Sequence, residues 1–185
     1  MINTQKTDKI NIGNKKFIVL VGLMGSGKTS LGKALAKLVN LPFLDSDSKI
    51  ENISGKTIKQ LFHGPGEAVF RQIEEETIKD ILNGNPVVLA TGGGAVINKN
   101  TATLINKKAL SIWLKADIEL LHRRTLGRKN RPLLTKENPL ATLKKLANSR
   151  EKYYKQSDII FQIKDEKISF SAKRLLETIK NFNHK

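Results

Sequence analysis

A glycine-rich segment near the N-terminus contains the residues best suited to bind phosphate. Gly-Leu-Met-Gly-Ser-Gly-Lys-Thr (residues 22–29) matches the pattern G-x-x-x-x-G-K-S/T and lies between a predicted strand and a predicted helix. In this pattern backbone N–H groups surround a phosphate anion, Lys28 reaches the β- and γ-phosphates, and Thr29 offers a hydroxyl to Mg²⁺. The sequence therefore predicts a nucleoside triphosphate site formed by Gly25, Ser26, Gly27, Lys28, Thr29 and Ser30.

Two carboxylates, Asp45 and Asp47, follow the second predicted strand. Because ligands of open parallel sheets bind beyond the carboxyl ends of the strands, both acids should lie at the ligand-binding edge, where they could divide their roles between a metal and a substrate hydroxyl. The next strand ends in Thr-Gly-Gly-Gly (residues 91–94) and lacks the acid that P-loop NTPases place there for Mg²⁺. Asp45 is then the acid expected near Mg²⁺, while Asp47 could contact a substrate hydroxyl or simply cap the next helix. The glycines would admit a ligand close to the backbone, or serve only a tight turn.

Arginine is rarer than lysine in this chain, and it alone binds carboxylate or phosphate through two parallel hydrogen bonds. Arg71 precedes Glu74 by three residues, a spacing at which the carboxylate can steady the guanidinium on one helix face. Arg150 lies in a long predicted helix. Between residues 125 and 136 a segment without periodicity, which contains Arg131, is predicted to form a mobile lid. From the residues alone, Arg71 and Arg150 could equally be surface ion-pair residues.

The elements that would position these residues alternate between strand and helix. Strands are predicted at residues 17–21, 41–44, 86–90, 109–114 and 159–163. Helices are predicted at residues 28–39, 47–53, 57–62, 67–82, 99–106, 118–124, 139–155 and 169–181. This alternation requires crossover connections and predicts an α/β fold, with a parallel sheet buried under helices on both faces. The polar residues 1–16 are expected to be a loose extension before a single domain at 17–185.

The composition excludes several classes of function. The 185 residues include no cysteine, which excludes disulfides, cysteine-based zinc sites, iron–sulfur clusters and thiol nucleophiles. No apolar run approaches the roughly 18 residues of a membrane span, so we expect a cytoplasmic protein. The 33 Lys and Arg against 17 Asp and Glu give a net charge of +16, which favours anionic ligands. Because only 5% of residues are aromatic, we expect small anionic substrates rather than nucleic acid, and a monomer without membrane contact.

Two other classes of nucleotide-binding protein fit the motifs less well. Gly25 and Gly27 could begin the G-x-G-x-x-G of a dinucleotide-binding fold, but Ser30 occupies the position of its third glycine. A switch GTPase would need an Asn-Lys-x-Asp segment to read guanine, and the sequence has none. Neither a dehydrogenase nor a regulatory GTPase is therefore expected.

Taken together, the motif segments resemble those of shikimate kinases. The resemblance spans about residues 17–163 and lies in segments 22–29, 43–47, 66–75 (Gly-Glu-Ala-Val-Phe-Arg-Gln-Ile-Glu-Glu), 91–96, 123–125, 131–134 (Arg-Pro-Leu-Leu) and 149–154 (Ser-Arg-Glu-Lys-Tyr-Tyr). It implies the nucleoside monophosphate kinase fold, a three-layer sandwich with five parallel strands ordered 2-3-1-4-5. It also implies that family's reaction, in which ATP with Mg²⁺ phosphorylates the 3-hydroxyl of shikimate on the route to aromatic amino acids, giving shikimate 3-phosphate and ADP.

The resemblance further implies roles for the residues on the acceptor side. Asp47 resembles the acid that binds the shikimate hydroxyls and orients the nucleophile. Arg71 and Arg150 resemble the pair that holds the shikimate carboxylate, and Gly93 and Gly94 resemble the glycines that line the same pocket.

On the nucleotide side, Asp45 resembles the acid near Mg²⁺, beside Thr29. Arg131 resembles the lid arginine that reaches the transferring phosphate, and Arg124 resembles the arginine stacked near the adenine. Lys28, Asp47 and Arg131 are therefore the expected catalytic residues.

Two parts of the chain depart from the family pattern. Residues 164–167 lack the expected adenine-loop pattern, so the sequence assigns no residue there to an adenine contact. Residues 1–16 have no counterpart in the family and lack the Arg and Ser of a plastid transit peptide. Two rival functions stay open: a gluconate-type kinase, which should lack the Arg71–Arg150 pair, and a non-catalytic ATP- or nucleic-acid-binding module.

Overall fold

The computed structural model describes residues 10, 12–126 and 138–182. Its centre is a five-stranded parallel sheet with the order β2-β3-β1-β4-β5. The strands are β1 (Phe17–Val21), β2 (Phe43–Asp45), β3 (Val88–Ala90), β4 (Ala109–Lys115) and β5 (Ile159–Gln162). All five residues of β1 are buried, as a strand covered on both faces requires. The predicted α/β class and strand order are confirmed.

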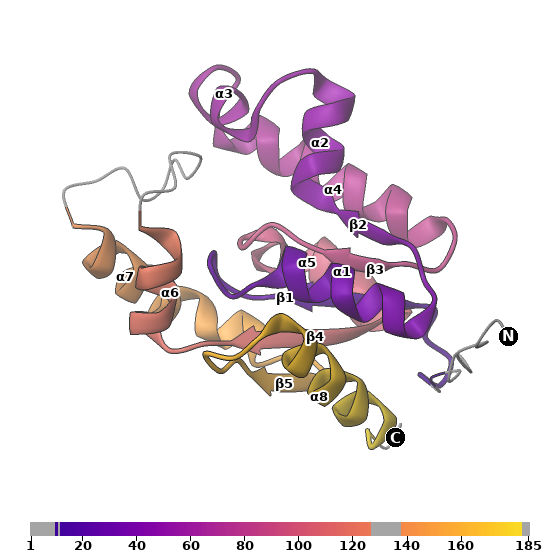
Figure 1. Cartoon of the computed structure of the whole chain (residues 1–185). Coiled ribbons are helices and arrows are strands. Elements are labelled where there is room, and N and C mark those ends of the chain that lie inside the picture. The colour runs from indigo at the N-terminus through magenta and orange to yellow at the C-terminus, as the bar shows by residue number, and fades with distance from the viewer. Residues whose placement is uncertain (1–9, 11, 127–137, 183–185) are drawn as a thin grey trace, which may run out of the picture.

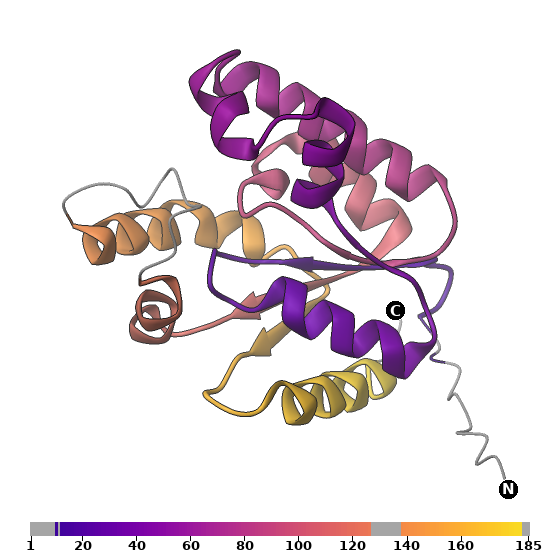
Figure 2. The same ribbon diagram turned by 45° about the horizontal axis from the view of Figure 1, so that its top comes forward.

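Helices cover both faces of this sheet (Figures 1 and 2). On one face lie α1 (Lys28–Val39) and α8 (Ile168–Lys180), and on the other lie α4 (Glu67–Asn83), α5 (Lys99–Lys108) and α7 (Pro139–Tyr154). The alternation of side chains along β1 builds both layers. Phe17, Val19 and Val21 pack toward α4, α5 and α7, whereas Ile18 and Leu20 pack toward α1 and α8.

Two smaller groups of helices are attached to these layers and flank the loop that follows β1 (Figure 1). In the first, α2 (Ser46–Ser54) and α3 (Ile58–His63) pack on α4 around their own apolar cluster of Ile50, Leu61 and Phe70. In the second, α6 (Ile118–Thr125) packs against α7. The site described below lies between the two groups.

Proline explains where the predicted strand bounds were wrong. The bounds of β1 and α1 are as predicted, but β2 and β3 begin two residues late, after Pro42 and Pro86. Proline has no N–H, so neither Pro42 nor Pro86 can donate a backbone hydrogen bond to an adjacent strand. A short 3₁₀ helix, η1 (Ala95–Ile97), follows the glycines after β3 and was not predicted.

Part of the N-terminal segment contacts the domain. Ile10 and Ile12 pack against the apolar layer beneath α1 and α8, and the N–H of Lys16 donates to the carbonyl of Lys108 at 3.0 Å. Residues 1–9 and 11 lie outside the described residues, so the division of the chain at residue 16 stays a prediction. Within the described parts, none of the helices is long and apolar enough to cross a membrane.

Candidate active site

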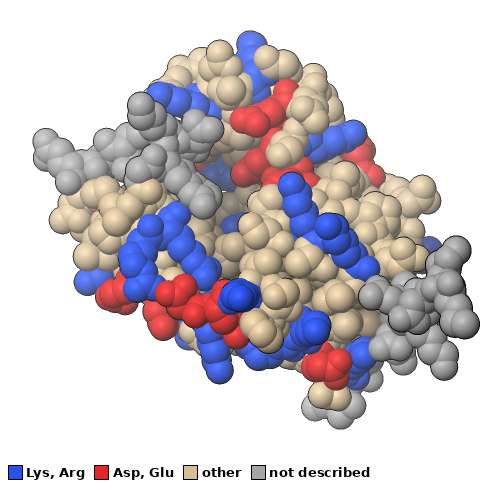
Figure 3. Space-filling model, in the orientation of Figure 1, with Lys and Arg blue, Asp and Glu red and all other residues tan. Residues whose placement is uncertain are grey.

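A cavity of about 1160 Å³ opens beyond the carboxyl ends of β1, β2 and β3. Figure 3 shows this hollow near the centre of the surface, with acidic and basic side chains around it. Residues predicted for both substrates line it together: Gly25, Gly27, Lys28, Thr29, Ser30, Asp45, Asp47, Arg71, Gly93, Gly94, Arg124 and Arg150. Ser26 is buried, and Arg131 lies outside the described residues with residues 127–136 of the predicted lid.

The loop between β1 and α1 is shaped to accept an anion. Gly27 caps α1 with a left-handed φ of 91°, and it has no side chain that could satisfy the first N–H groups of the helix. Gly25 also has a positive φ, of 84°, which a residue with a side chain rarely adopts. The N–H groups at the start of α1 and the positive end of the helix dipole therefore face the cavity.

Lys28 and Ser26 are placed for phosphate within this loop. The ammonium of Lys28 donates to the carbonyls of Gly22 at 2.8 Å and Leu23 at 2.9 Å. The hydroxyl oxygen of Ser26 is buried and has no hydrogen-bond partner among the residues that the structure describes. A buried hydroxyl without a partner is costly, so a ligand oxygen arriving in the loop would be stabilised by it.

Asp45 has two roles at the end of β2. One carboxylate oxygen accepts the N–H groups of Asp47 and Ser48, so Asp45, and not Asp47 as the sequence left open, is the residue that caps α2. The other oxygen accepts the hydroxyl of Thr29 at 2.7 Å. This cap explains why α2 begins one residue earlier than predicted, and it leaves Asp47 at the cavity wall.

The oxygen atoms of Thr29 and Asp45 suit a magnesium ion. Mg²⁺ prefers hard oxygen ligands and is commonly held by one or two protein groups together with phosphate oxygens and water. Over the described ranges, no three His, Cys, Asp or Glu side chains gather into a metal site made of protein alone. The donor set thus fits a magnesium ion that arrives with a nucleotide.

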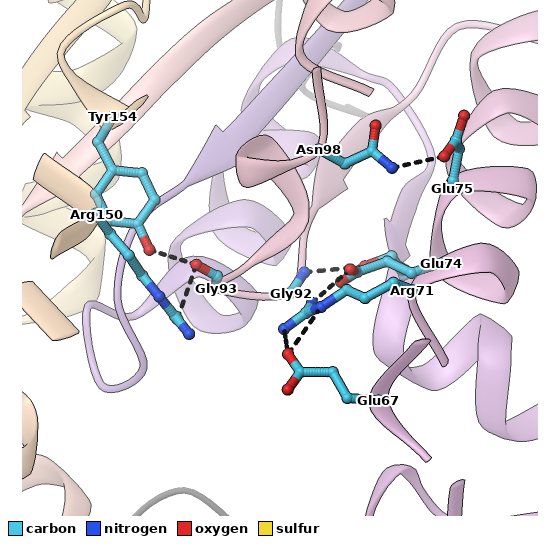
Figure 4. Close-up of polar contacts among 10 residues, drawn as sticks. Glu67, Arg71, Glu74, Glu75, Gly92, Gly93, Asn98, Arg150 and Tyr154 are labelled. Atoms are coloured by element: carbon cyan, nitrogen blue, oxygen red, sulfur yellow. Dashed lines mark hydrogen bonds and ion pairs between the residues drawn. The ribbon is translucent and has the colours of Figure 1, made fainter. Parts of the chain in front are cut away.

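Arg71 is held on α4 by two carboxylates (Figure 4). Its guanidinium contacts Glu74 at 2.6 Å and Glu67 at 3.0 Å, and it lies over the rings of Phe62 and Phe70. The predicted contact with Glu74 is present. The contact with Glu67 was missed, although the i, i+4 spacing of these two residues in the sequence could have indicated it.

Burial sets the charge balance around Arg71. Glu74 is only 2% exposed, and burial raises the pKa of its carboxyl although the charge of Arg71 opposes this shift. Burial lowers the pKa of Arg71, but the carboxylates of Glu74 and Glu67 together raise it above its usual value. Arg71 is therefore a permanent cation at the cavity wall.

Arg150 and Arg71 lie on either side of the glycines that follow β3. Arg150, on α7, is 7% exposed and donates to the carbonyl of Gly93 at 3.0 Å. A Cβ atom added to Gly94 would lie 2.6 Å from the guanidinium of Arg71, and one added to Gly93 would lie 3.3 Å from that of Arg150. None of Gly92, Gly93 and Gly94 has a positive φ. Gly93 and Gly94 are thus needed for space beside the arginines, and Gly92 for space beside the carboxylates of Glu74 and Asp47, and not for a tight turn.

Arg124 lies at the opposite end of the cavity, on α6. Its guanidinium donates to the carbonyl of Lys164 at 3.4 Å and lies 3.7 Å from the carboxylate of Asp165. The neighbouring residues Glu166 and Ile168 also line the cavity. Residues 164–167, to which the sequence assigned no adenine contact, therefore lie beside Arg124 at this end of the cavity.

Comparison with known proteins gives a consistent result. The sequence model of the shikimate kinase family matches residues 24–180. A shikimate kinase of Rhizobium leguminosarum bv. trifolii is 43% identical over 162 residues, which cover 88% of this chain and 83% of the relative. The structure of the shikimate kinase of Acinetobacter baumannii in complex with shikimate superposes with a TM-score of 0.87 at 35% identity, covering 89% of this chain and 93% of that one.

A kinase of the rival class is less similar to this chain. A gluconokinase from Sinorhizobium meliloti superposes with a TM-score of 0.55 at 15% identity, which shows a shared fold alone. The family match covers Lys28 and Thr29 of the P-loop, both acids, Arg71, Arg150 and the glycines between these arginines. The chain therefore belongs to the shikimate kinase family of ATP-dependent phosphotransferases.

Proposed function

We propose that this protein transfers the γ-phosphate of ATP to the 3-hydroxyl of shikimate, as a monomer in the cytoplasm. One observation supports this most strongly: a single cavity has a phosphate-binding loop on one wall and Arg71, Arg150 and Asp47 on another. The first wall suits a nucleoside triphosphate, and the second suits a small molecule with one carboxylate and several hydroxyls. The net charge of +16 favours the approach of both anions.

On the phosphate side, the residues act by positioning the phosphate groups and by neutralising their charge. Lys28 exchanges the carbonyls of Gly22 and Leu23 for β- and γ-phosphate oxygens, and the N–H groups at the start of α1 bind the β-phosphate. Thr29 and Asp45 would hold Mg²⁺, which supplies further positive charge to the phosphate oxygens. These groups are fixed by the loop before ATP binds, so little rearrangement is needed during transfer.

On the acceptor side, two arginines and an acid orient shikimate. Arg71 and Arg150 bind its carboxylate, and the glycines between them let the ring approach the backbone. Asp47 accepts the hydrogen bond of the reacting hydroxyl and aligns its oxygen with the γ-phosphate. Arg124 stacks near the adenine, with Ile168 across from it at the same end of the cavity.

Arg131 completes the proposed site from outside the described residues. We expect Arg131→Ala to lower kcat about a hundredfold and to leave the ATP Kd within threefold, because its contact with the moving phosphate forms only during transfer. Single-turnover kinetics and nucleotide titration separate the two effects. A variant with near-normal kcat would remove Arg131 from the catalytic set and reduce residues 125–136 to a surface loop.

Gly94→Ala tests the space that the glycines provide. The added methyl would displace the guanidinium of Arg71, which is the mobile end of a long side chain. The fold should therefore survive, while binding of the substrate carboxylate should weaken. The φ of Gly94 is −108°, which alanine adopts without strain. We expect the shikimate KM to rise about tenfold or more with an unchanged ATP KM. An unchanged shikimate KM would show that Arg71 need not stay where it lies.

The decisive experiment measures ADP release in the presence and absence of shikimate, coupled to detection of shikimate 3-phosphate. We expect release to depend on shikimate and one phosphorylated product to form per ADP. Gluconate in place of shikimate tests the rival kinase, and salt-sensitive binding of a polynucleotide without ADP release would instead support the non-catalytic module. ADP release that ignores shikimate would overturn the proposal.

A further inference from the structure

A single backbone carbonyl in the cavity wall accepts two hydrogen bonds from α7. Arg150 donates to the oxygen of Gly93 at 3.0 Å, and the hydroxyl of Tyr154 donates to the same oxygen at 2.5 Å (Figure 4). The two donors are four residues apart and therefore lie on one face of the helix. The motif pattern assigns no role to Tyr154, and this residue is absent from the cavity lining.

Tyr154 is a fixed and permanent donor. It is 1% exposed, and its ring stacks on Trp113 of β4 with the ring centres 5.7 Å apart. Burial raises the pKa of Tyr154 to about 12, although Arg150 opposes this shift. The hydroxyl thus keeps its proton throughout the neutral range, and the packing holds it in one place.

The carbonyl that Tyr154 binds belongs to the peptide that joins the two arginine sites. Because a peptide unit is planar, fixing the oxygen of Gly93 also fixes the N–H and Cα of Gly94. Gly94 lies directly against the guanidinium of Arg71, and Gly93 lies against that of Arg150. The orientation of this one peptide therefore sets how far apart the two guanidinium groups lie.

We propose that Tyr154 is a positioning residue that orients the Gly93–Gly94 peptide and thereby matches Arg71 and Arg150 to one carboxylate. It contacts neither substrate. This inference rests on the proposed function, since it assumes that the two arginines bind the acceptor carboxylate. Without the hydroxyl, Arg150 alone holds the carbonyl, and the same guanidinium must also bind the substrate.

Tyr154→Phe tests this role because it removes only the hydroxyl from a ring that stays packed. We expect the shikimate KM and Kd to rise about three- to tenfold, the size of effect that one neutral hydrogen bond gives, with kcat and the ATP KM within twofold of the wild type. Tyr153→Phe is the matched control, because it removes the same atom from the neighbouring residue and should change neither constant. Melting temperatures of all variants show whether any change comes from lost stability.

A double-mutant cycle distinguishes positioning from general loosening. If Tyr154 acts through the peptide shared with Arg150, Tyr154→Phe should weaken shikimate binding much less in an Arg150→Ala background than in the wild type. Equal factors in both backgrounds, or an unchanged shikimate KM in Tyr154→Phe, would overturn the inference. A different result would contradict the proposed function: ADP release by the wild-type protein that does not depend on shikimate. In that case calorimetric titration of shikimate alone into the same variants still decides whether Tyr154 affects the carboxylate site.

Discussion

Lys28→Met is expected to lower kcat by about 10² to 10³. The ammonium is the only lysine charge that the P-loop motif directs at the β- and γ-phosphates, and methionine offers no donor at that place. The charge matters most in the transition state, where the phosphate oxygens gain negative charge as the bond to ADP breaks. The loss should therefore fall on kcat, with a smaller rise in the ATP KM.

The fold should survive this substitution. Lys28 is only partly buried and donates to two carbonyls of its own loop, so its removal should cost about 1–2 kcal/mol of unfolding free energy. For a chain of this length such a loss lowers the melting temperature by several degrees. Circular dichroism and thermal melting of the variant would confirm that the kinetic loss has a local origin.

Lys33→Met is the matched control for Lys28→Met. Lys33 lies on the same helix, is exposed, and stacks over the ring of Phe43 outside the cavity. Its replacement changes the net charge by the same amount and should leave kcat within twofold. A Lys28→Met enzyme that keeps more than a tenth of the wild-type rate would contradict the assignment of the P-loop. A rate lost equally in both variants would point instead to the overall charge.

The parts of the fold that could be predicted are those set by local rules. The G-x-x-x-x-G-K-S/T pattern fixes the end of β1 and the start of α1, and both have the predicted bounds. Hydrophobic periodicity was enough to place the remaining helices to within a residue or two. At β2 and β3 the apolar run extended across a proline, and hydrogen bonding, not hydropathy, decided where each strand begins.

The parts of the site that could not be predicted depend on contacts between elements that are far apart in the sequence. Glu74 is an ordinary acid in the helical pattern, and its burial becomes visible only once Gly92, from the loop after β3, lies against it. Tyr154 likewise fits an apolar position of α7, and nothing in its spacing shows that its hydroxyl meets the carbonyl of Gly93. A sequence can indicate which side chains suit a substrate, but the groups that hold those side chains are set by tertiary packing.

Replacing Arg71 or Arg150 with alanine should weaken shikimate binding far more than ATP binding. Each arginine supplies charge-assisted hydrogen bonds worth about 1.5–3 kcal/mol, which corresponds to about 10- to 150-fold in the shikimate Kd. The proposed ATP site lies at the P-loop wall of the cavity, so the ATP Kd should change less than threefold. Calorimetric titration of each ligand into each variant measures the two effects separately.

The two variants should differ in stability, which helps to assign the loss in binding. Arg71→Ala leaves the carboxylate of Glu74 buried without its ion pair, so the melting temperature should fall. Arg71→Lys keeps a positive charge near Glu74 but cannot bind a carboxylate through two parallel bonds, so it should recover stability more than shikimate affinity.

Arg123→Ala serves as the control for these two substitutions. Arg123 pairs with Asp165 at 2.7 Å on the surface, outside the cavity lining, and its loss should leave the shikimate Kd unchanged. If both Arg71→Ala and Arg150→Ala bound shikimate as the wild type does, the carboxylate would have to bind elsewhere, and the role of the glycines between the arginines would fall with it. A loss confined to Arg71→Ala and matched by its fall in stability would leave Arg150 as a structural anchor for Gly93, because its hydrogen bond to that carbonyl needs no substrate.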